Sequence, residues 1–135
     1  VIKRELSGFV LNRLQGALLT EAMRLVAEGY ITPADLDKTI SAGLGLRWSF
    51  LGPFATIELN APGGVPDYCA RYAEFYRQLA TTPAGPESWS AANAALVADA
   101  MGTSFNAAQR DARMQWRDRR LMALARHKRE QPDSD

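Results

Sequence analysis

The chain has 135 residues, of which 47% are apolar and 23% charged, and its formal net charge at pH 7 is +1. This length is enough for one domain with its own core, and a net charge near zero favours neither nucleic acid nor a membrane surface as partner. The single cysteine, Cys69, excludes an internal disulfide and fits a reducing compartment. No apolar run approaches the ~18 residues of a membrane span, and no signal peptide is recognisable. We therefore expect a cytoplasmic protein.

Both ends of the sequence are informative. The chain opens with Val-Ile-Lys and not with methionine, which suggests a piece of a longer protein. The only histidine, His127, lies in a charged tail, where we expect it to be exposed and not catalytic. A reaction that needs a buried histidine base would have to take it from elsewhere.

Helical periodicity runs through the whole sequence, and no segment indicates a strand. The first helix is expected from about residue 8 to residue 28, with Gly29 as its C-terminal glycine. Its apolar residues at helical spacing predict a buried face: Leu11, Leu14, Leu18, Ala22 and Leu25. A second helix is expected from Thr32, the N-cap, and Pro33, at the first helical position, to about Gly43.

The segment GLGLRWSFLGPF, residues 43–54, is rich in glycine and aromatics and is predicted to be an ordered loop. Further helices are expected over about 53–59, 66–79, 89–101 and 107–129. The aromatic residues from Tyr68 to Tyr76 are predicted to lie in the core, and Cys69 to be a small packed side chain. The predicted fold class is all-α, with about six helices.

Gly8, Asn12 and Gly16 are spaced four residues apart, so on a helix they would form one stripe with little bulk and a single amide. A glycine inside a helix costs about 1 kcal/mol relative to alanine, and asparagine is a weak helix former. Because these residues lower helix stability, the stripe indicates another role: its small side chains would let a ligand, a partner helix or another domain approach the helix backbone closely. The simpler alternative for Asn12 is an amide that bonds a neighbouring backbone group.

The stretch SGFVLNRL, residues 7–14, resembles the Gly-Phe-x-x-Asn-Arg motif that opens the C-terminal domain of the L-3-hydroxyacyl-CoA dehydrogenase family. Residues 21–64 and the ending RMQWRDRRLMALARHK are similar to one branch of that family, which holds lambda-crystallin (L-gulonate 3-dehydrogenase) and the carnitine dehydrogenases. The resemblance covers almost the whole chain, most strongly from Gly8 to Gly64.

This resemblance implies that residues 1–135 are a single substrate-binding and dimerisation domain of the 6-phosphogluconate dehydrogenase C-terminal-like type. An N-terminal Rossmann domain, absent from this chain, would bind NAD and carry a His–Glu pair. No cofactor-binding residue and no metal ligand is therefore expected here. The implied reaction is the oxidation of an L-3-hydroxy acid such as L-gulonate to the 3-keto acid. Asn12 would be the active-site asparagine that fixes the reacting oxygen and the catalytic histidine for hydride transfer.

Arg47 and Trp48, in the stretch GLGLRWSF, are the candidate substrate-binding residues. The branch that acts on free 3-hydroxy acids resembles this chain in having an Arg–aromatic pair. A guanidinium can hold a carboxylate through two parallel, charge-assisted hydrogen bonds, and a thioester offers no such anion. Arg47 is therefore predicted to select free acids. The simpler alternative is a surface arginine whose stem lies over Trp48.

Two other patterns in the sequence are weaker indications of function. The pair Gly43 and Gly45 is a weak nucleotide-binding signal, because the third glycine is missing and no strand precedes it. The segment from Arg110 to Arg129 is rich in arginine, with eight Lys and Arg residues, and a solvated helix face is preferred to a nucleic-acid arm. Its apolar residues indicate that part of it packs: Trp116, Leu121, Met122 and Leu124.

The expected partners are a small 3-hydroxy acid, the chain's own Rossmann domain and a second copy in a homodimer, with no nucleic acid and no membrane. Three alternatives stay open. One is a true 3-hydroxyacyl-CoA dehydrogenase that acts on thioesters. Another is a helical dimerisation module without a catalytic role, and a nucleic-acid binder is the remote third.

Overall fold

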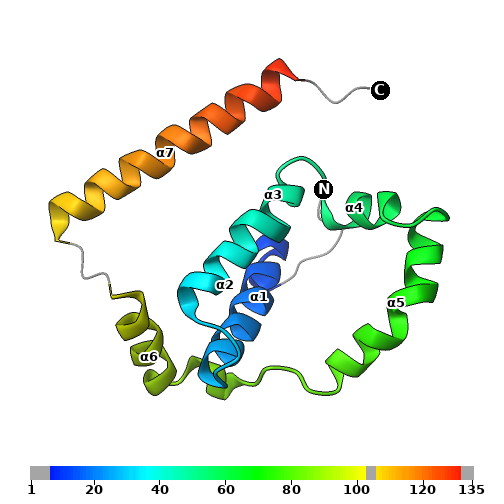
Figure 1. The fold of residues 1–135 in the computed structure, drawn as a ribbon, viewed down its shortest axis with the longest axis horizontal. Helices are drawn as coiled ribbons and strands as arrows, with labels where there is room; N and C mark the ends of the chain where they lie inside the picture. Colours follow the sequence, from blue (N-terminus) through cyan, green and yellow to red (C-terminus); the bar gives the residue numbers. More distant parts are fainter. Residues whose placement is uncertain (1–6, 103–105, 132–135) are drawn as a thin grey trace. The chain divides into compact units, whose positions relative to one another are not determined.

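The computed structural model describes residues 7–102 and 106–131, and these residues form helices and no strand (Figure 1). The all-α prediction is confirmed. The chain divides into two units, Val1–Met101 and Gly102–Asp135, and each has its own helices.

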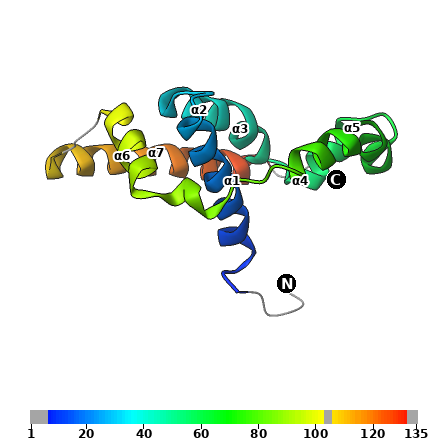
Figure 2. The ribbon, with the colours of Figure 1, turned by 90° about the horizontal axis from the view of Figure 1, so that it is seen from below.

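The first unit holds most of the helices. They are α1 (Val10–Ala27), α2 (Pro33–Thr39), the π-helix η1 (Ile40–Leu44), α3 (Gly45–Trp48), α4 (Pro53–Leu59), α5 (Gly64–Ala80), the 3-10 helix η2 (Pro86–Trp89) and α6 (Ala91–Met101). The second unit contains α7 (Ala107–Glu130). Because α2, η1 and α3 follow one another without a break (Figure 2), the described residues form six helical segments besides the short η2.

The start of α1 lies two residues later than predicted. Gly8 and Phe9 have φ angles of 82° and 53°, and a right-handed helix excludes positive φ. Gly8 therefore lies outside the helix, and the low-bulk stripe is reduced to Asn12 and Gly16. Gly29 ends α1 as predicted, with a φ of 78°.

Two hydrogen bonds close the end of α1. The backbone N–H of Gly29 donates to the carbonyl of Val26 at 3.0 Å, and that of Tyr30 donates to the carbonyl of Leu25 at 3.0 Å. This is the Schellman pattern, in which a glycine with positive φ turns the chain out of the helix.

The predicted loop over residues 43–54 is wrong in its first half, because residues 43–48 are helical. The π-turn of η1 joins α2 to α3, and the N–H of Gly45 donates to the carbonyl of Ile40, five residues earlier. A Cβ atom at Gly45 would lie 3.0 Å from that carbonyl oxygen, so glycine here permits the wider turn. Arg47 and Trp48 consequently lie on the last turn of a helix.

Only the second half of α1 is packed within the described chain. Val26 is 7% exposed, whereas Leu11 and Leu14 are 74% and 63% exposed. The predicted buried face is therefore wrong for the first two turns. The physical reason is that η2 and α6, the described elements that contact α1, meet it near Thr20 and Val26.

Few side chains in the described part of the chain are buried. The buried apolar ones there are Val26, Pro33 and Ala61, although a chain of this length can bury a core. The core prediction for the α5 aromatics is wrong, since Phe75 and Tyr76 are about half exposed, and Cys69 is exposed too. Within the described residues α5 contacts α4, so most of its surface stays open.

The second unit is the single long helix α7. Asn106 and Gln109 form a reciprocal capping box at its start. The guanidinium carbons of Arg113 and Arg120 lie 4.5 and 4.8 Å from the centre of the Trp116 ring. Three of the four apolar residues that were predicted to pack are exposed in the described chain: Trp116, Leu121 and Met122. Their packing stays a prediction. Leu124 is half-buried and, as predicted, His127 is exposed.

No helix within the described residues combines the length and apolar character that a membrane crossing requires.

Candidate substrate-binding site

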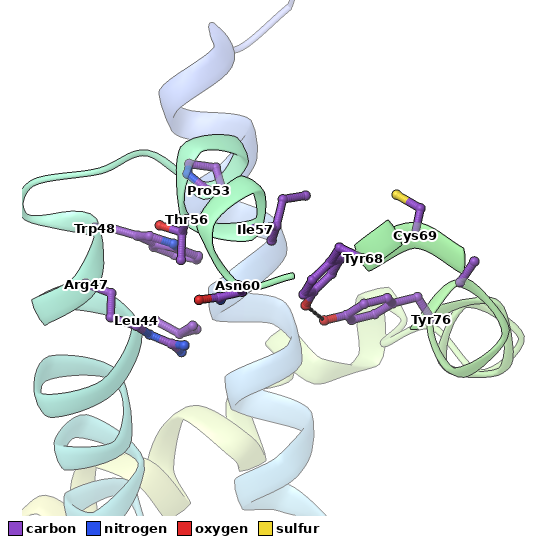
Figure 3. A pocket seen from close by; sticks show the side chains of 11 residues that line it. Leu44, Arg47, Trp48, Pro53, Thr56, Ile57, Asn60, Tyr68, Cys69 and Tyr76 are labelled. Atoms are coloured by element: carbon purple, nitrogen blue, oxygen red, sulfur yellow. Dashed lines mark hydrogen bonds between the residues drawn. The ribbon is translucent and has the colours of Figure 1, made fainter. Parts of the chain in front are cut away.

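A cavity of about 410 Å³ is formed by η1, α3, α4 and α5 in the first unit (Figure 3). Its lining is mainly apolar and aromatic, with a few polar groups. The lining residues are Leu44, Arg47, Trp48, Pro53, Thr56, Ile57, Asn60, Tyr68, Cys69, Ala73 and Tyr76. This composition is typical of small-molecule sites.

Arg47 and Trp48, the two predicted substrate-binding residues, both line this cavity. The structure brings them there because the π-turn extends α2 into α3. Among the described residues, Arg47 is the only charged side chain of the lining and forms no ion pair. It does not stack on Trp48 either, since the described cation–π contacts both involve Trp116. Its guanidinium is therefore available to an anion.

The opposite wall comes from α5 and was missed as a site by sequence reasoning. The hydroxyl groups of Tyr68 and Tyr76 lie 2.8 Å apart and share a hydrogen bond. The Tyr68 ring also lies 4.7 Å from that of Tyr72, centre to centre. The available signal was the four-residue spacing of three tyrosines, which places three hydroxyl groups on one face of a helix.

The Tyr68–Tyr76 hydrogen bond raises the pKa of Tyr68 above its usual value, and burial adds to this shift. The positive charge of Arg47 acts in the opposite direction on the same pKa. The guanidinium thus favours the ionised form of Tyr68, against the larger effect of the Tyr68–Tyr76 hydrogen bond.

Two polar residues of α4 complete the lining. The Thr56 hydroxyl donates to the carbonyl of Gly52 at 2.9 Å. The side-chain amide of Asn60, at the C-cap of α4, forms no hydrogen bond with the described residues. Figure 3 shows Arg47, Asn60 and the tyrosine pair directed toward the same space from three different helices.

A tight turn fixes α5 relative to α4. The carboxylate of Glu58 accepts a hydrogen bond from the backbone N–H of Val65 at 2.7 Å, and a Cβ at Gly64 would lie 2.5 Å from its oxygens. Asp67 accepts from the N–H of Gly63 at 3.2 Å and from Arg71 at 2.7 Å. The hydrogen bond from Arg71 is the main cause that lowers the pKa of Asp67, and the hydrogen bond from the Gly63 N–H lowers it further.

Asn12 does not lie in this cavity. It is exposed on the first half of α1, and its side chain forms no hydrogen bond with the described residues. The simpler alternative, an amide bonded to a nearby backbone group, is therefore wrong for the described part of the chain. The structure thus does not bring all the predicted site residues into this cavity. Asn12 lies exposed on the first half of α1, whereas Arg47 and Trp48 line the cavity.

Within the described residues, no three His, Cys, Asp or Glu side chains are grouped so that they could hold a metal ion.

Comparison with known proteins defines the class. Residues 8–85 match the family described as 3-hydroxyacyl-CoA dehydrogenase, C-terminal domain, and the chain belongs to this family. It is similar to the lambda-crystallin homolog of Bos taurus, with 45% identity over 96% of this chain and 40% of that protein. It is also similar to lambda-crystallin of Oryctolagus cuniculus, with 42% identity over 96% of this chain and 41% of that protein.

A bacterial enzyme gives a third match. The L-carnitine dehydrogenase of Nocardiopsis dassonvillei is 36% identical over 93% of this chain and 38% of its own length. The chain thus spans about 40% of the length of these relatives.

Proposed function

We propose that this chain is the substrate-binding and dimerisation domain of an NAD-dependent dehydrogenase that oxidises a free L-3-hydroxy acid, such as L-gulonate, to the 3-keto acid. The observation that carries the proposal is Arg47, an unpaired guanidinium that is the single charge in the described lining of an apolar and hydroxyl-bearing cavity.

The position of Arg47 suits a carboxylate. A guanidinium binds a carboxylate through two parallel charge-assisted hydrogen bonds, and the apolar lining around it strengthens such a pair by reducing competition from water. A thioester carries no charge at this point. The name of one relative, L-carnitine dehydrogenase, also indicates a substrate that is a free acid.

Asn12 would act at a second point of the same substrate. An amide that forms no hydrogen bond with the described chain can donate to the oxygen of the reacting carbon and hold it in line for hydride removal. The apolar residues beside it, Leu11 and Leu14, are exposed, so an N-terminal domain would bury apolar surface by covering this half of α1. NAD, held mainly by that domain, accepts the hydride.

The homodimer is part of the proposal. Apolar side chains stay open on several helices of the described chain, for example Phe54 on α4 and Phe75 and Leu79 on α5. Large exposed apolar patches mark surfaces that another protein covers, and most oligomers of soluble proteins are symmetric dimers.

The test is an assay of the whole enzyme that carries this chain, with NADH formation as readout. Arg47→Ala is expected to raise KM for the free acid about 10-fold or more, because a hydrogen bond to a charged group contributes about 1.5–3 kcal/mol. Arg47→Lys should recover only part of the loss, because an ammonium cannot form the two parallel bonds. Arg77→Ala, on α5 outside the cavity lining, is the matched control.

Two outcomes would contradict the proposal. An unchanged KM in Arg47→Ala would show that this guanidinium does not hold the substrate. Preference of the unaltered enzyme for an L-3-hydroxyacyl-CoA over every free acid would assign the chain to the thioester-using alternative.

A further inference from the structure

A second cavity, of about 360 Å³, adjoins the first, because three residues line both: Arg47, Thr56 and Asn60. The rest of its lining is apolar and comes from α3, α4 and the turn between them: Leu46, Phe50, Leu51 and Leu59. We propose that this second cavity binds a carboxylic acid with an unbranched alkyl tail of about eight carbons, which competes with the substrate for Arg47. This inference rests on the proposed role of Arg47 and assigns a different ligand to a different cavity.

The charge of Arg47 determines the polar end of such a ligand. Arg47 is the only charged residue in the described lining of the second cavity, and it forms no ion pair with the described residues. A guanidinium holds a carboxylate through two parallel, charge-assisted hydrogen bonds. The side-chain amide of Asn60 can donate one more. The ligand should therefore place a carboxylate beside α3 and the end of α4.

The apolar lining determines the tail. Leu46 and Leu59 are 60% and 73% exposed, so a chain that covers them removes apolar surface from water, and each buried methylene group strengthens binding about fourfold. A chain that carries hydroxyl groups would lose its hydrogen bonds to water here, where these side chains cannot replace them. The volume corresponds to about twelve water molecules, at about 30 Å³ each in the liquid, which suits the roughly ten non-hydrogen atoms of octanoate.

The shared guanidinium makes the two cavities mutually exclusive. Arg47 can form its two parallel hydrogen bonds with one carboxylate at a time. An alkyl acid in the second cavity would therefore remove the carboxylate-binding group from the first. Such an acid has no hydroxyl group on its third carbon and so has no hydride to give. It should act as an inhibitor, and the activity of the enzyme should fall as alkyl acids accumulate.

A second copy of the chain is the alternative occupant of this apolar surface. An apolar protein surface placed over the cavity would remove water from the Arg47 guanidinium without supplying a negative charge, which is unfavourable. A carboxylic acid covers the same apolar side chains and neutralises the guanidinium as well. The charge at the edge of the cavity thus favours the small acid.

The experiment measures inhibition of the whole enzyme by octanoate and by butyrate, with L-gulonate as substrate and NADH formation as readout. Titration calorimetry without substrate measures the binding of octanoate directly. Leu59→Gln and Leu46→Gln place a polar group in the lining and keep a good helix former. Leu121→Gln is the matched control, because Leu121 is also exposed, at 57%, and lines neither cavity.

Octanoate should inhibit competitively against L-gulonate and bind about 10-fold or more tightly than butyrate, which has the same charge and four fewer methylene groups. Leu59→Gln should weaken octanoate about 5-fold and leave KM for L-gulonate unchanged. Leu46→Gln should act in the same way, and it keeps the test valid if Leu59→Gln does not fold. Arg47→Ala should weaken the binding of octanoate in the calorimeter about 10-fold or more.

Equal inhibition by octanoate and butyrate would overturn the inference, and so would inhibition that excess L-gulonate does not relieve. The absence of octanoate binding would point to the second copy as occupant and overturn it too. Equal affinities for octanoate in the Leu59→Gln, Leu46→Gln and Leu121→Gln variants would show that the tail lies elsewhere. In each of these cases oxidation of L-gulonate still supports the proposed function. If no free acid is oxidised, the proposed function fails, and the calorimetric comparison of the Arg47 and leucine variants still decides this inference.

Discussion

The indole N–H of Trp89 donates a hydrogen bond of 2.9 Å to the hydroxyl oxygen of Thr20, which lies 69 residues earlier in the chain. The Thr20 hydroxyl donates in turn to the carbonyl of Gly16 at 2.7 Å. The side-chain amide of Asn93 donates to the carbonyls of Glu87 and Ser88. These bonds hold η2 between α1 and α6, and so fix the helix that presents the proposed active-site amide.

Removal of the Thr20 hydroxyl should destabilise the first unit. Thr20→Val keeps the shape of the side chain but leaves the Trp89 N–H without its protein partner, and we expect the free energy of unfolding to fall by about 1 kcal/mol. Urea denaturation measures this change. Thr81→Val is the control, because the Thr81 hydroxyl bonds only within its own helix end. Equal midpoints for the two variants would show that the Trp89–Thr20 bond does not stabilise the fold.

Substitutions at the two glycines around the π-turn should differ in effect. Gly43→Ala adds a methyl group to open space and should stabilise the helix by up to about 1 kcal/mol. Gly45→Ala places a Cβ 3.0 Å from the carbonyl oxygen of Ile40, so we expect no such stabilisation from it. Because the crowded turn would displace Arg47, this variant should also raise KM for the acid. Thermal unfolding of both variants checks the difference. Equal stability and equal KM would contradict it.

Asn12→Ala should separate activity from stability. If Asn12 holds the reacting oxygen, kcat should fall roughly 100- to 1,000-fold, as on removal of one such donor elsewhere. Because the Asn12 side chain is exposed and alanine is the better helix former, the free energy of unfolding should stay equal or rise slightly. Gln15→Ala, another exposed amide of α1, is the control. Retention of kcat in Asn12→Ala would remove this residue from the mechanism.

The turn that positions α5 should weaken in acid. The pKa of Asp67 is lowered in the folded chain, first by Arg71, so its stabilising contribution is present above the unfolded pKa of about 3.9. It is lost as the pH falls through the lowered value. Asp67→Asn should therefore be less stable at neutral pH and show a weaker loss of stability below about pH 4. Thermal unfolding between pH 2 and pH 7 measures this, with Asp37→Asn as an exposed control on α2.

Local signals in the sequence predicted most of the helix ends. Thr32 accepts a hydrogen bond from the N–H of Asp35, and Gly29 takes the positive φ expected of a C-terminal glycine. The continuation from α2 into α3 was missed, because glycines normally indicate a stop and a π-turn has no propensity signal of its own. Burial was predicted poorly, since periodicity identifies the apolar side of a helix without showing whether this chain supplies its partner.

The residues of the candidate site were predicted from the sequence only in part. Arg47 and Trp48 were selected from a resemblance, and the structure places both in one cavity. Tyr68 and Tyr76 were assigned to a core because aromatic residues at helical spacing are usually buried. Their mutual hydrogen bond depends on side-chain geometry along α5, which sequence spacing alone does not reveal.

The π-turn between α2 and α3 also suggests how this segment tolerates a change in length. Each residue advances an α-helix by about 100°, and a π-turn accommodates one additional residue without ending the helix. Loss of one codon within Ile40–Leu44 would therefore let the segment close into a regular α-helix with Arg47 and Trp48 still facing the same side. A deletion elsewhere in this continuous helix would instead rotate both side chains by about 100°, so the π-turn is the place where the chain can lose a residue without redirecting the cavity lining.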